Sequence, residues 1–119
     1  MVRIDIAPPN LVVEVQGADK FFALKSRLVI PLAHVVRADT DPAAARKGWK
    51  GLRLPGTSIP GVLTAGSFYW RGVWTFWDVR RADRTIVIDL RNERYSRLVV
   101  EVADPEAAVR MISAALPPA

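Results

Sequence analysis

Five cationic side chains in one acid-free window are the residues of this sequence whose chemistry stands out most. The window runs from Pro42 to Trp77 and contains no Asp or Glu, while the whole chain has 17 Lys and Arg against 12 Asp and Glu. The formal net charge is +5, so this window accounts for the whole excess. Such a segment attracts anionic proteins, membranes or nucleic acid, unless it is a cationic loop that only aids solubility. The five cations are Arg46, Lys47, Lys50, Arg53 and Arg71.

Aromatic side chains accompany these cations. Trp49 lies inside the basic stretch "RKGWKGLRLPGTSIPG", which spans residues 46–61. Six more rings fall within residues 68–77, across a predicted hairpin in which alternation directs some rings outward. A mixed aromatic and basic face binds membrane interfaces, single-stranded nucleic acid or proteins, whereas the alternative is that the rings fill a small core. The candidate ligand-binding residues are therefore Arg46, Lys47, Trp49, Lys50, Arg53 and Arg71.

Catalytic and metal-binding chemistry has little support in this sequence. The chain has one histidine, His34, and no cysteine, whereas protein zinc sites combine several His and Cys ligands. His34 lies between two apolar neighbours, where a hydrogen-bonded structural histidine is more common than a catalytic base. A phosphate-binding loop needs Gly-Lys followed by a hydroxyl residue, and "GWKGLRLPG" lacks that order. We therefore predict no catalytic residue, no metal and no cofactor.

The elements that must position these residues are mostly short strands. Period-two alternation, as in Ile86, Ile88 and Leu90, predicts half-buried strands, and Arg71-Gly72 fits a tight turn between two of them. Residues 40–60 show no sustained period, and their glycines and prolines predict a long loop. The predicted strands, which together span about residues 11–102, cover residues 11–16, 21–32, 34–39, 61–70, 73–80, 85–90 and 97–102.

The end of the chain predicts one amphipathic helix over residues 104–116. Asp104 suits the N-cap, Pro105 suits the first helical position, and Glu106 complements the positive end of the helix dipole. Apolar residues then recur at steps of three and four and form one stripe. This stripe needs a surface to cover, such as the open end of a barrel or the gap between two sheets.

These elements predict a single α+β domain over residues 1–119, mainly antiparallel, with about seven strands in a bent barrel or two-sheet sandwich capped by the C-terminal helix. The stretches "RLVIPLAHVVRAD" and "YSRLVVEVADPEAAVRMISAAL", with the strand-rich segment between them, resemble the bacterial pleckstrin-homology-like domain family over residues 11–116. The resemblance implies a seven-stranded bent antiparallel barrel closed by a C-terminal helix. It implies no enzyme activity and no established ligand.

The expected function is a non-catalytic binding module that recognises an anionic protein or membrane surface through the basic, aromatic-containing loop. The alternative is a small-molecule-binding or enzymatic β-barrel with an interior site. Nucleic acid is a weaker expectation because no nucleic-acid-binding motif accompanies the positive charge. The first residues, "MVRIDIAPPN", do not resemble a signal peptide, and no apolar stretch approaches the ~20 residues that span a bilayer. A cytoplasmic location is expected, peripheral to the membrane if a membrane is the partner.

Overall fold

The computed structural model describes residues 1–17, 27–40, 52–59 and 63–117 of the chain. Its first sheet has three antiparallel strands in the order β1-β2-β3. Apolar residues alternate along these strands, as in Leu28 and Ile30, because one face packs on the core and the other meets solvent. The strands are β1 (Val2–Ala7), β2 (Asn10–Val15) and β3 (Arg27–Pro31).

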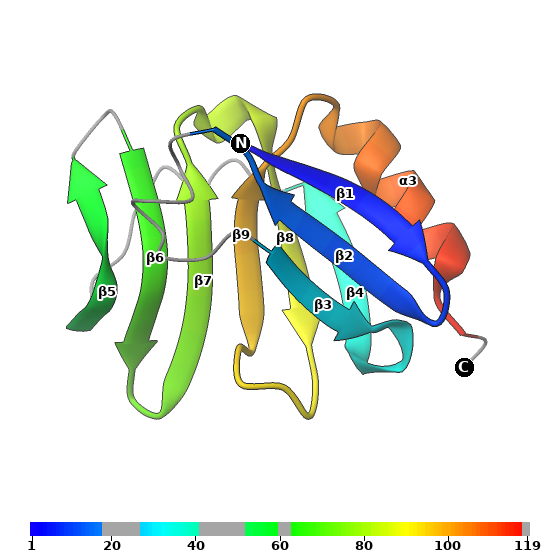
Figure 1. Ribbon diagram of the computed structural model, residues 1–119, viewed down its shortest axis with the longest axis horizontal. Coiled ribbons are helices and arrows are strands. Elements are labelled where there is room, and N and C mark those ends of the chain that lie inside the picture. Colours follow the sequence, from blue (N-terminus) through cyan, green and yellow to red (C-terminus); the bar gives the residue numbers. More distant parts are fainter. Residues whose placement is uncertain (18–26, 41–51, 60–62, 118–119) are drawn as a thin grey trace.

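The second sheet has six strands in the order β4-β8-β9-β7-β6-β5. All of its neighbouring strands run antiparallel except β7 and β9, which pair in parallel. Figure 1 shows the first sheet in front of the β4, β8 and β9 part of this sheet, while β7, β6 and β5 extend beyond it. The six strands are β4 (Val35–Thr40), β5 (Leu52–Ile59), β6 (Leu63–Trp70), β7 (Val73–Val79), β8 (Thr85–Leu90) and β9 (Arg97–Glu101).

The helix predicted at the end of the chain is confirmed as α3 (Pro105–Ala115). Its N-cap is Asp104, whose side chain accepts a hydrogen bond of 3.1 Å from the backbone N–H of Ala107, and the helix begins with a proline as predicted. Ile112 is fully buried, and α3 packs against β4, β8 and β1. The helix therefore closes one side of the gap between the two sheets (Figure 1).

One main hydrophobic core lies between the two sheets and the helix, as a two-sheet sandwich requires. Burial of such side chains stabilises the fold by about 1.5–3 kcal/mol each. The fully buried members from both sheets and the helix are Leu11, Val13, Ala65, Phe76, Ile86, Ile88, Leu98, Val100 and Ile112.

The sandwich is confirmed, whereas the bent barrel is wrong. Among the strands that the structure describes, β3 and β4 end different sheets and do not pair. Pro31 ends β3 without an N–H group to donate, and the short 3-10 helix η1 (Leu32–His34) then directs the chain into the other sheet. A second 3-10 helix, η2 (Ala82–Arg84), precedes β8.

A second, smaller apolar cluster lies on the opposite face of the six-stranded sheet. Successive side chains of a strand point to opposite faces, so Phe76 enters the main core while Trp77 belongs to the second cluster. The ring of Phe68 lies 6.4 Å from that of Trp77 in an edge-on arrangement. The aromatic hairpin of β6 and β7 thus packs on both faces. The second cluster contains Phe68, Trp77, Val79, Val87 and Val99.

Two segments differ from the sequence prediction. The predicted loop of residues 40–60 contains β5, and residues 41–51 of that loop lie outside the described residues. The β5–β6 register shifts between Arg53 and Gly56, so β5 shows no regular alternation by which a sequence pattern could find it. Strand β1 precedes the first predicted strand. Within the described residues, no helix is long and apolar enough to cross a membrane.

Candidate binding surface

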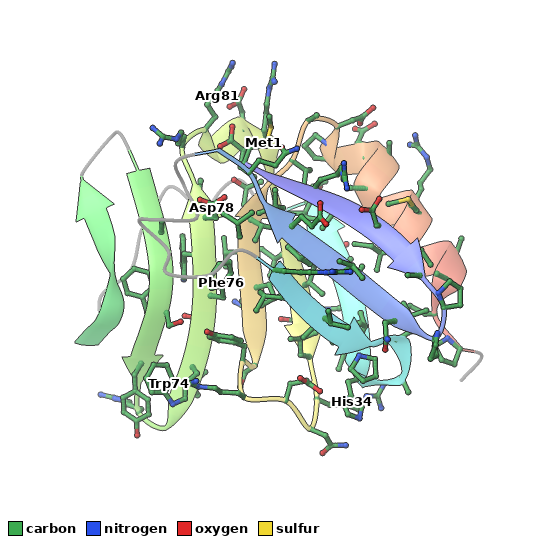
Figure 2. The ribbon with its side chains drawn as sticks, viewed as in Figure 1. Met1, His34, Trp74, Phe76, Asp78 and Arg81 are labelled. Atoms are coloured by element: carbon green, nitrogen blue, oxygen red, sulfur yellow. The ribbon has the colours of Figure 1, made fainter. Side chains whose placement is uncertain are left out.

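Three connections meet at one end of the six-stranded sheet and form the candidate binding surface. They are η1, the β6–β7 turn and residues 91–96 between β8 and β9. The backbone N–H of Ser96 donates to the carbonyl of Trp74 at 2.8 Å, and that of Arg91 donates to the carbonyl of His34 at 2.8 Å. Figure 2 shows Trp74 and His34 at this end of the molecule. We call this surface the basic end and define it by Tyr69, Arg71, Trp74, Arg91 and Arg94.

The β6–β7 turn presents Arg71 at the tip of the hairpin. Trp70 pairs with Val73, so only Arg71 and Gly72 connect the strands. Both have positive φ, 49° and 83°, which is the backbone of a two-residue turn that matches the twist of a hairpin. The predicted tight turn is confirmed, and the side chains of Arg71 and Val73 are exposed. The turn therefore holds a cation beside an exposed apolar residue.

Arg94 stacks on the aromatic rings next to this turn. Its guanidinium carbon lies 4.9 Å from the ring centroid of Trp74 and 5.9 Å from that of Tyr95. Tyr69, which is 36% exposed, lies on the other strand with its ring 5.2 Å from that of Trp74. A cation over an aromatic face gains about 0.5–1 kcal/mol at exposed sites. This stacking holds Arg94 in place at the surface.

Tyr95 anchors the 91–96 connection in the core beneath the surface. Its side chain is buried, its hydroxyl lies 2.6 Å from Oγ of Ser67, and its ring lies 5.8 Å from that of Phe76. A buried hydroxyl that finds a hydrogen-bond partner avoids the cost of desolvation. Because Tyr95 is fixed in this way, Arg94 follows a defined backbone instead of a free loop.

His34 and Glu93 join η1 to the same connection. Nδ1 of His34 lies 2.5 Å from Oε2 of Glu93, and both side chains are partly buried. The prediction that His34 is a hydrogen-bonded residue is confirmed. This contact holds the carboxylate of Glu93 toward η1, while Arg91 and Arg94 on the same connection remain exposed.

Most of the predicted site residues lie outside the part of the chain that the structure describes. Arg46, Lys47, Trp49 and Lys50 fall within residues 41–51, and of Arg53 only the backbone, on β5, is described. Arg71 is the one predicted site residue whose side chain the structure describes, and it lies at the basic end. The sequence prediction missed Arg91 and Arg94, for which "RNERYS" was the available signal.

The parallel pairing of β7 and β9 brings these separate segments together. Thr75 pairs with Arg97 and Phe76 with Leu98, so the starts of the two strands are neighbours. The connection that leads into β9 consequently lies beside the turn that leads into β7. In an antiparallel meander, β8 would lie between β7 and β9 and would separate these two connections.

Several carboxylates of the described strands and of η2 are paired with a cation. Asp78, fully buried on β7, lies 3.0 Å from the α-amino group of Met1 (Figure 2). Such pairing leaves these side chains as structural ions and does not form the close carboxylate pair that acid–base catalysis uses. The other pairs are Asp5 with Arg3 at 3.2 Å, Asp83 with Arg81 at 3.1 Å, and Asp89 with Arg37 at 2.8 Å and Arg97 at 2.9 Å.

Asp89 ties three strands together on the outer face of the six-stranded sheet. Burial raises the pKa of Asp89, but the hydrogen bonds and positive charges of Arg37 and Arg97 outweigh burial and leave this pKa below its ordinary value. The same contact raises the pKa of Arg37. A small cavity of about 170 Å³ adjoins these side chains, with Asp39 and Thr40 at its edge. The paired charges of the cluster link β4, β8 and β9 and so stabilise the sheet.

An apolar groove of about 490 Å³ separates the start of β1 from the start of α3. Its walls include Val2 and Ile4 of β1 and Ala107, Ala108 and Met111 of α3. The groove opens on the side of the sandwich, between the first sheet and the helix. Within residues 1–17, 27–40, 52–59 and 63–117, no three His, Asp or Glu side chains gather to hold a metal ion.

Comparison with known proteins gives no match for this chain. No protein-family model matches the chain, and neither a curated protein nor a solved structure matches it. The resemblance to the pleckstrin-homology-like family therefore stays a prediction.

Proposed function

We propose that the protein is a non-catalytic binding module that recognises an acidic segment of another protein through its basic end. The observation that carries the proposal is the guanidinium of Arg94, stacked on Trp74 beside Tyr69 and next to the hairpin that presents Arg71. Arg91 adds a third exposed cation from the same connection. Arginine, tryptophan and tyrosine are the residues enriched in the energetic centres of protein interfaces.

The chemistry of this surface favours carboxylates as the groups recognised. Guanidinium groups form paired, charge-assisted hydrogen bonds with carboxylates. Tyr69 and Trp74 pack against each other, and Trp74 is half-buried beneath Arg94. These two rings are thus engaged within the protein, whereas rings that insert into a bilayer interface present their apolar faces to lipid. This difference favours an acidic protein segment over a membrane.

The basic end also has little conformational freedom to lose when a partner binds. Backbone hydrogen bonds from Arg91 and Ser96 fix both ends of the 91–96 connection, and Tyr95 is anchored inside. Ordering a flexible side chain at an interface costs about 0.5–1.5 kcal/mol. Prior stacking of Arg94 on Trp74 reduces that cost, so a surface of modest size retains affinity.

The test is a titration of fluorescently labelled poly-glutamate peptide with three forms of the full chain. The wild type is compared with the triple variant Arg71→Gln, Arg91→Gln and Arg94→Gln, and with a matched control. The control, which loses the same charge from exposed arginines elsewhere, carries Arg27→Gln, Arg84→Gln and Arg110→Gln. We expect the wild type and the control to bind with an affinity that falls as salt rises, since the Debye length is about 8 Å at physiological ionic strength. The triple variant should bind at least about tenfold more weakly, which corresponds to ~1.4 kcal/mol.

Parallel measurements decide between this surface and its competitors. Wild-type binding to phosphatidylserine vesicles, with no binding to the peptide, would replace the protein partner with a membrane. A variant with Gln at residues 46, 47, 50 and 53 tests the basic stretch predicted from the sequence. Loss of peptide binding in that variant alone would assign recognition to residues 46–53. Equal binding by all forms, or no binding at all, would show that the arginines of the basic end are only solvated surface.

A further inference from the structure

The outer edge of β1 carries backbone groups that β2 does not use, in a regular pattern. The N–H of Gln16 donates to the carbonyl of Met1 at 3.0 Å, and the β1–β2 register pairs Arg3 with Glu14. Hydrogen-bonded pairs alternate along an antiparallel ladder, so the backbone groups of Arg3 and Asp5 face β2. Those of Val2, Ile4 and Ile6 face away, and none of the strands described pairs with that edge.

The side chains along this edge are complementary to a second copy of themselves. Arg3 and Asp5 flank Ile4 on the solvent face of β1, with side chains 58% and 47% exposed. If two β1 strands pair antiparallel about a two-fold axis at Ile4, Val2 lies opposite Ile6 and Arg3 lies opposite Asp5 of the second copy. Opposite charges directly across a strand pair are stabilising, and like charges are destabilising. Each copy supplies one member of both ion pairs.

The backbone hydrogen-bonding groups of β1 fit the same register. With the axis at Ile4, the outward-facing N–H and C=O groups of Val2, Ile4 and Ile6 meet their counterparts as hydrogen-bonded pairs of an antiparallel ladder. A shift of one residue would place backbone groups that already serve β2 at the new interface and would separate the charges. Backbone direction therefore excludes a shift of one residue, and a shift of two residues would set like charges opposite each other.

Apolar surface beside this edge would also be covered. The groove of about 490 Å³ between β1 and α3 is lined by Val2 and Ile4 on one side and by Ala107, Ala108 and Met111 on the other. Met111 is 40% exposed, although helix surfaces normally keep large apolar side chains from water. Figure 1 shows α3 beside β1, with the edge of β1 that is not paired to β2 turned toward it.

From the edge, the charges and the groove together, we propose that two copies of the chain associate through antiparallel pairing of their β1 strands. The two-fold axis passes near Ile4, and the two three-stranded sheets become one continuous sheet. Such an interface is isologous, since the same patch serves on both copies, and it covers an edge that otherwise invites uncontrolled pairing. This proposal is independent of the binding module, because β1 and the basic end share no residue.

The test exchanges charges across the interface in the full chain. Arg3→Asp places two acids at positions 3 and 5, and Asp5→Arg places two arginines there, so each variant alone opposes like charges in the proposed register. Mixed together, the two variants match again: the new Asp at position 3 of one copy meets the new Arg at position 5 of the other, and the native Asp5 of the first copy meets the native Arg3 of the second. Sedimentation velocity of wild type should show a species of twice the 13.2 kDa chain mass. Each variant alone should dimerise at least about tenfold more weakly, and the equimolar mixture should recover the wild-type dimer.

A second measurement keeps the result independent of folding. Arg3→Asp also removes the 2.7 Å hydrogen bond from Arg3 to Glu14, so circular dichroism of each variant accompanies sedimentation, and recovery in the mixture requires both variants to be folded. In wild type, hydrogen exchange at the amides of Val2, Ile4 and Ile6 should slow as protein concentration rises. A wild type that stays monomeric at millimolar concentration overturns the proposal. Variants that dimerise normally, or a folded mixture that does not recover, also overturn it.

Discussion

Replacement of Asp89 by asparagine tests how the charged cluster on the outer face stabilises the sheet. Asp89 accepts hydrogen bonds from Arg37 on β4 and Arg97 on β9, at 2.8 and 2.9 Å, and its own side chain is 20% exposed. Asparagine keeps the size of the side chain but removes its charge. The substitution therefore removes both ion pairs without opening a cavity.

The expected loss is modest because both arginines are partly solvated, with side chains 67% and 46% exposed. Exposed ion pairs contribute about 0.2–1 kcal/mol each, so Asp89→Asn should lower the free energy of unfolding at pH 7 by about 0.5–2 kcal/mol. Folding lowers the pKa of Asp89, so its stabilisation is fully present above the unfolded-state pKa of about 3.9. It is lost as pH falls through the folded-state pKa. The difference between wild type and variant should thus begin to shrink near pH 4.

The assay is urea unfolding of both proteins, followed by tryptophan fluorescence at pH 7 and at steps below pH 4. Asp83→Asn is the matched control, since it removes the same charge from an exposed pair, with Arg81, that joins no two strands. We expect the control to unfold at the wild-type midpoint at pH 7. The assignment of this stabilisation to the ionised carboxylate would be wrong if the free energy of unfolding of Asp89→Asn equalled that of wild type at pH 7. It would also be wrong if the difference between the two free energies persisted unchanged to pH 2.

Three further substitutions probe the core, the turn and the buried anchor, each by thermal or urea unfolding. Ile112→Ala should cost about 2–5 kcal/mol, because the side chain is fully buried between the helix and both sheets; a loss below ~1 kcal/mol would show that α3 packs loosely. Gly72→Ala should cost about 1–2 kcal/mol, since its φ of 83° is unfavourable for a residue with Cβ; an unchanged midpoint would contradict the turn. Tyr95→Phe leaves the buried hydroxyl of Ser67 without this partner, and should cost about 1–3 kcal/mol. Faster hydrogen exchange over residues 91–96 should accompany that loss, and wild-type exchange rates would contradict the anchoring role.

Local patterns predicted the parts of the fold whose environment changes in a regular way along the chain. Ile86, Ile88 and Leu90 alternate because β8 has one face in the main core, and the Asp104 cap begins α3 because its side chain serves a free N–H group. The turn at Gly72 was predictable from glycine's freedom at positive φ. In each case the determining interaction lies within a few residues of sequence.

The parts that were missed depend on distant partners. Strand β5 is held by its neighbour β6 through a shifted register, and the basic end exists only because β9 pairs in parallel with β7. Nothing near Arg94 in the sequence indicates that Trp74 lies beneath its guanidinium. Tertiary pairing decided these features, and local propensity carries little information about it.

The most direct test of the central claim is an NMR titration of the isotope-labelled chain with unlabelled poly-glutamate peptide. We expect amide shifts to concentrate at residues 69–74 and 91–96, together with the indole N–H of Trp74, and to diminish as salt is added. The Arg71, Arg91 and Arg94 to Gln variant should show none of these shifts. Shifts centred elsewhere, such as residues 46–53, or a spectrum unchanged at saturating peptide, would contradict recognition of acidic segments by the basic end.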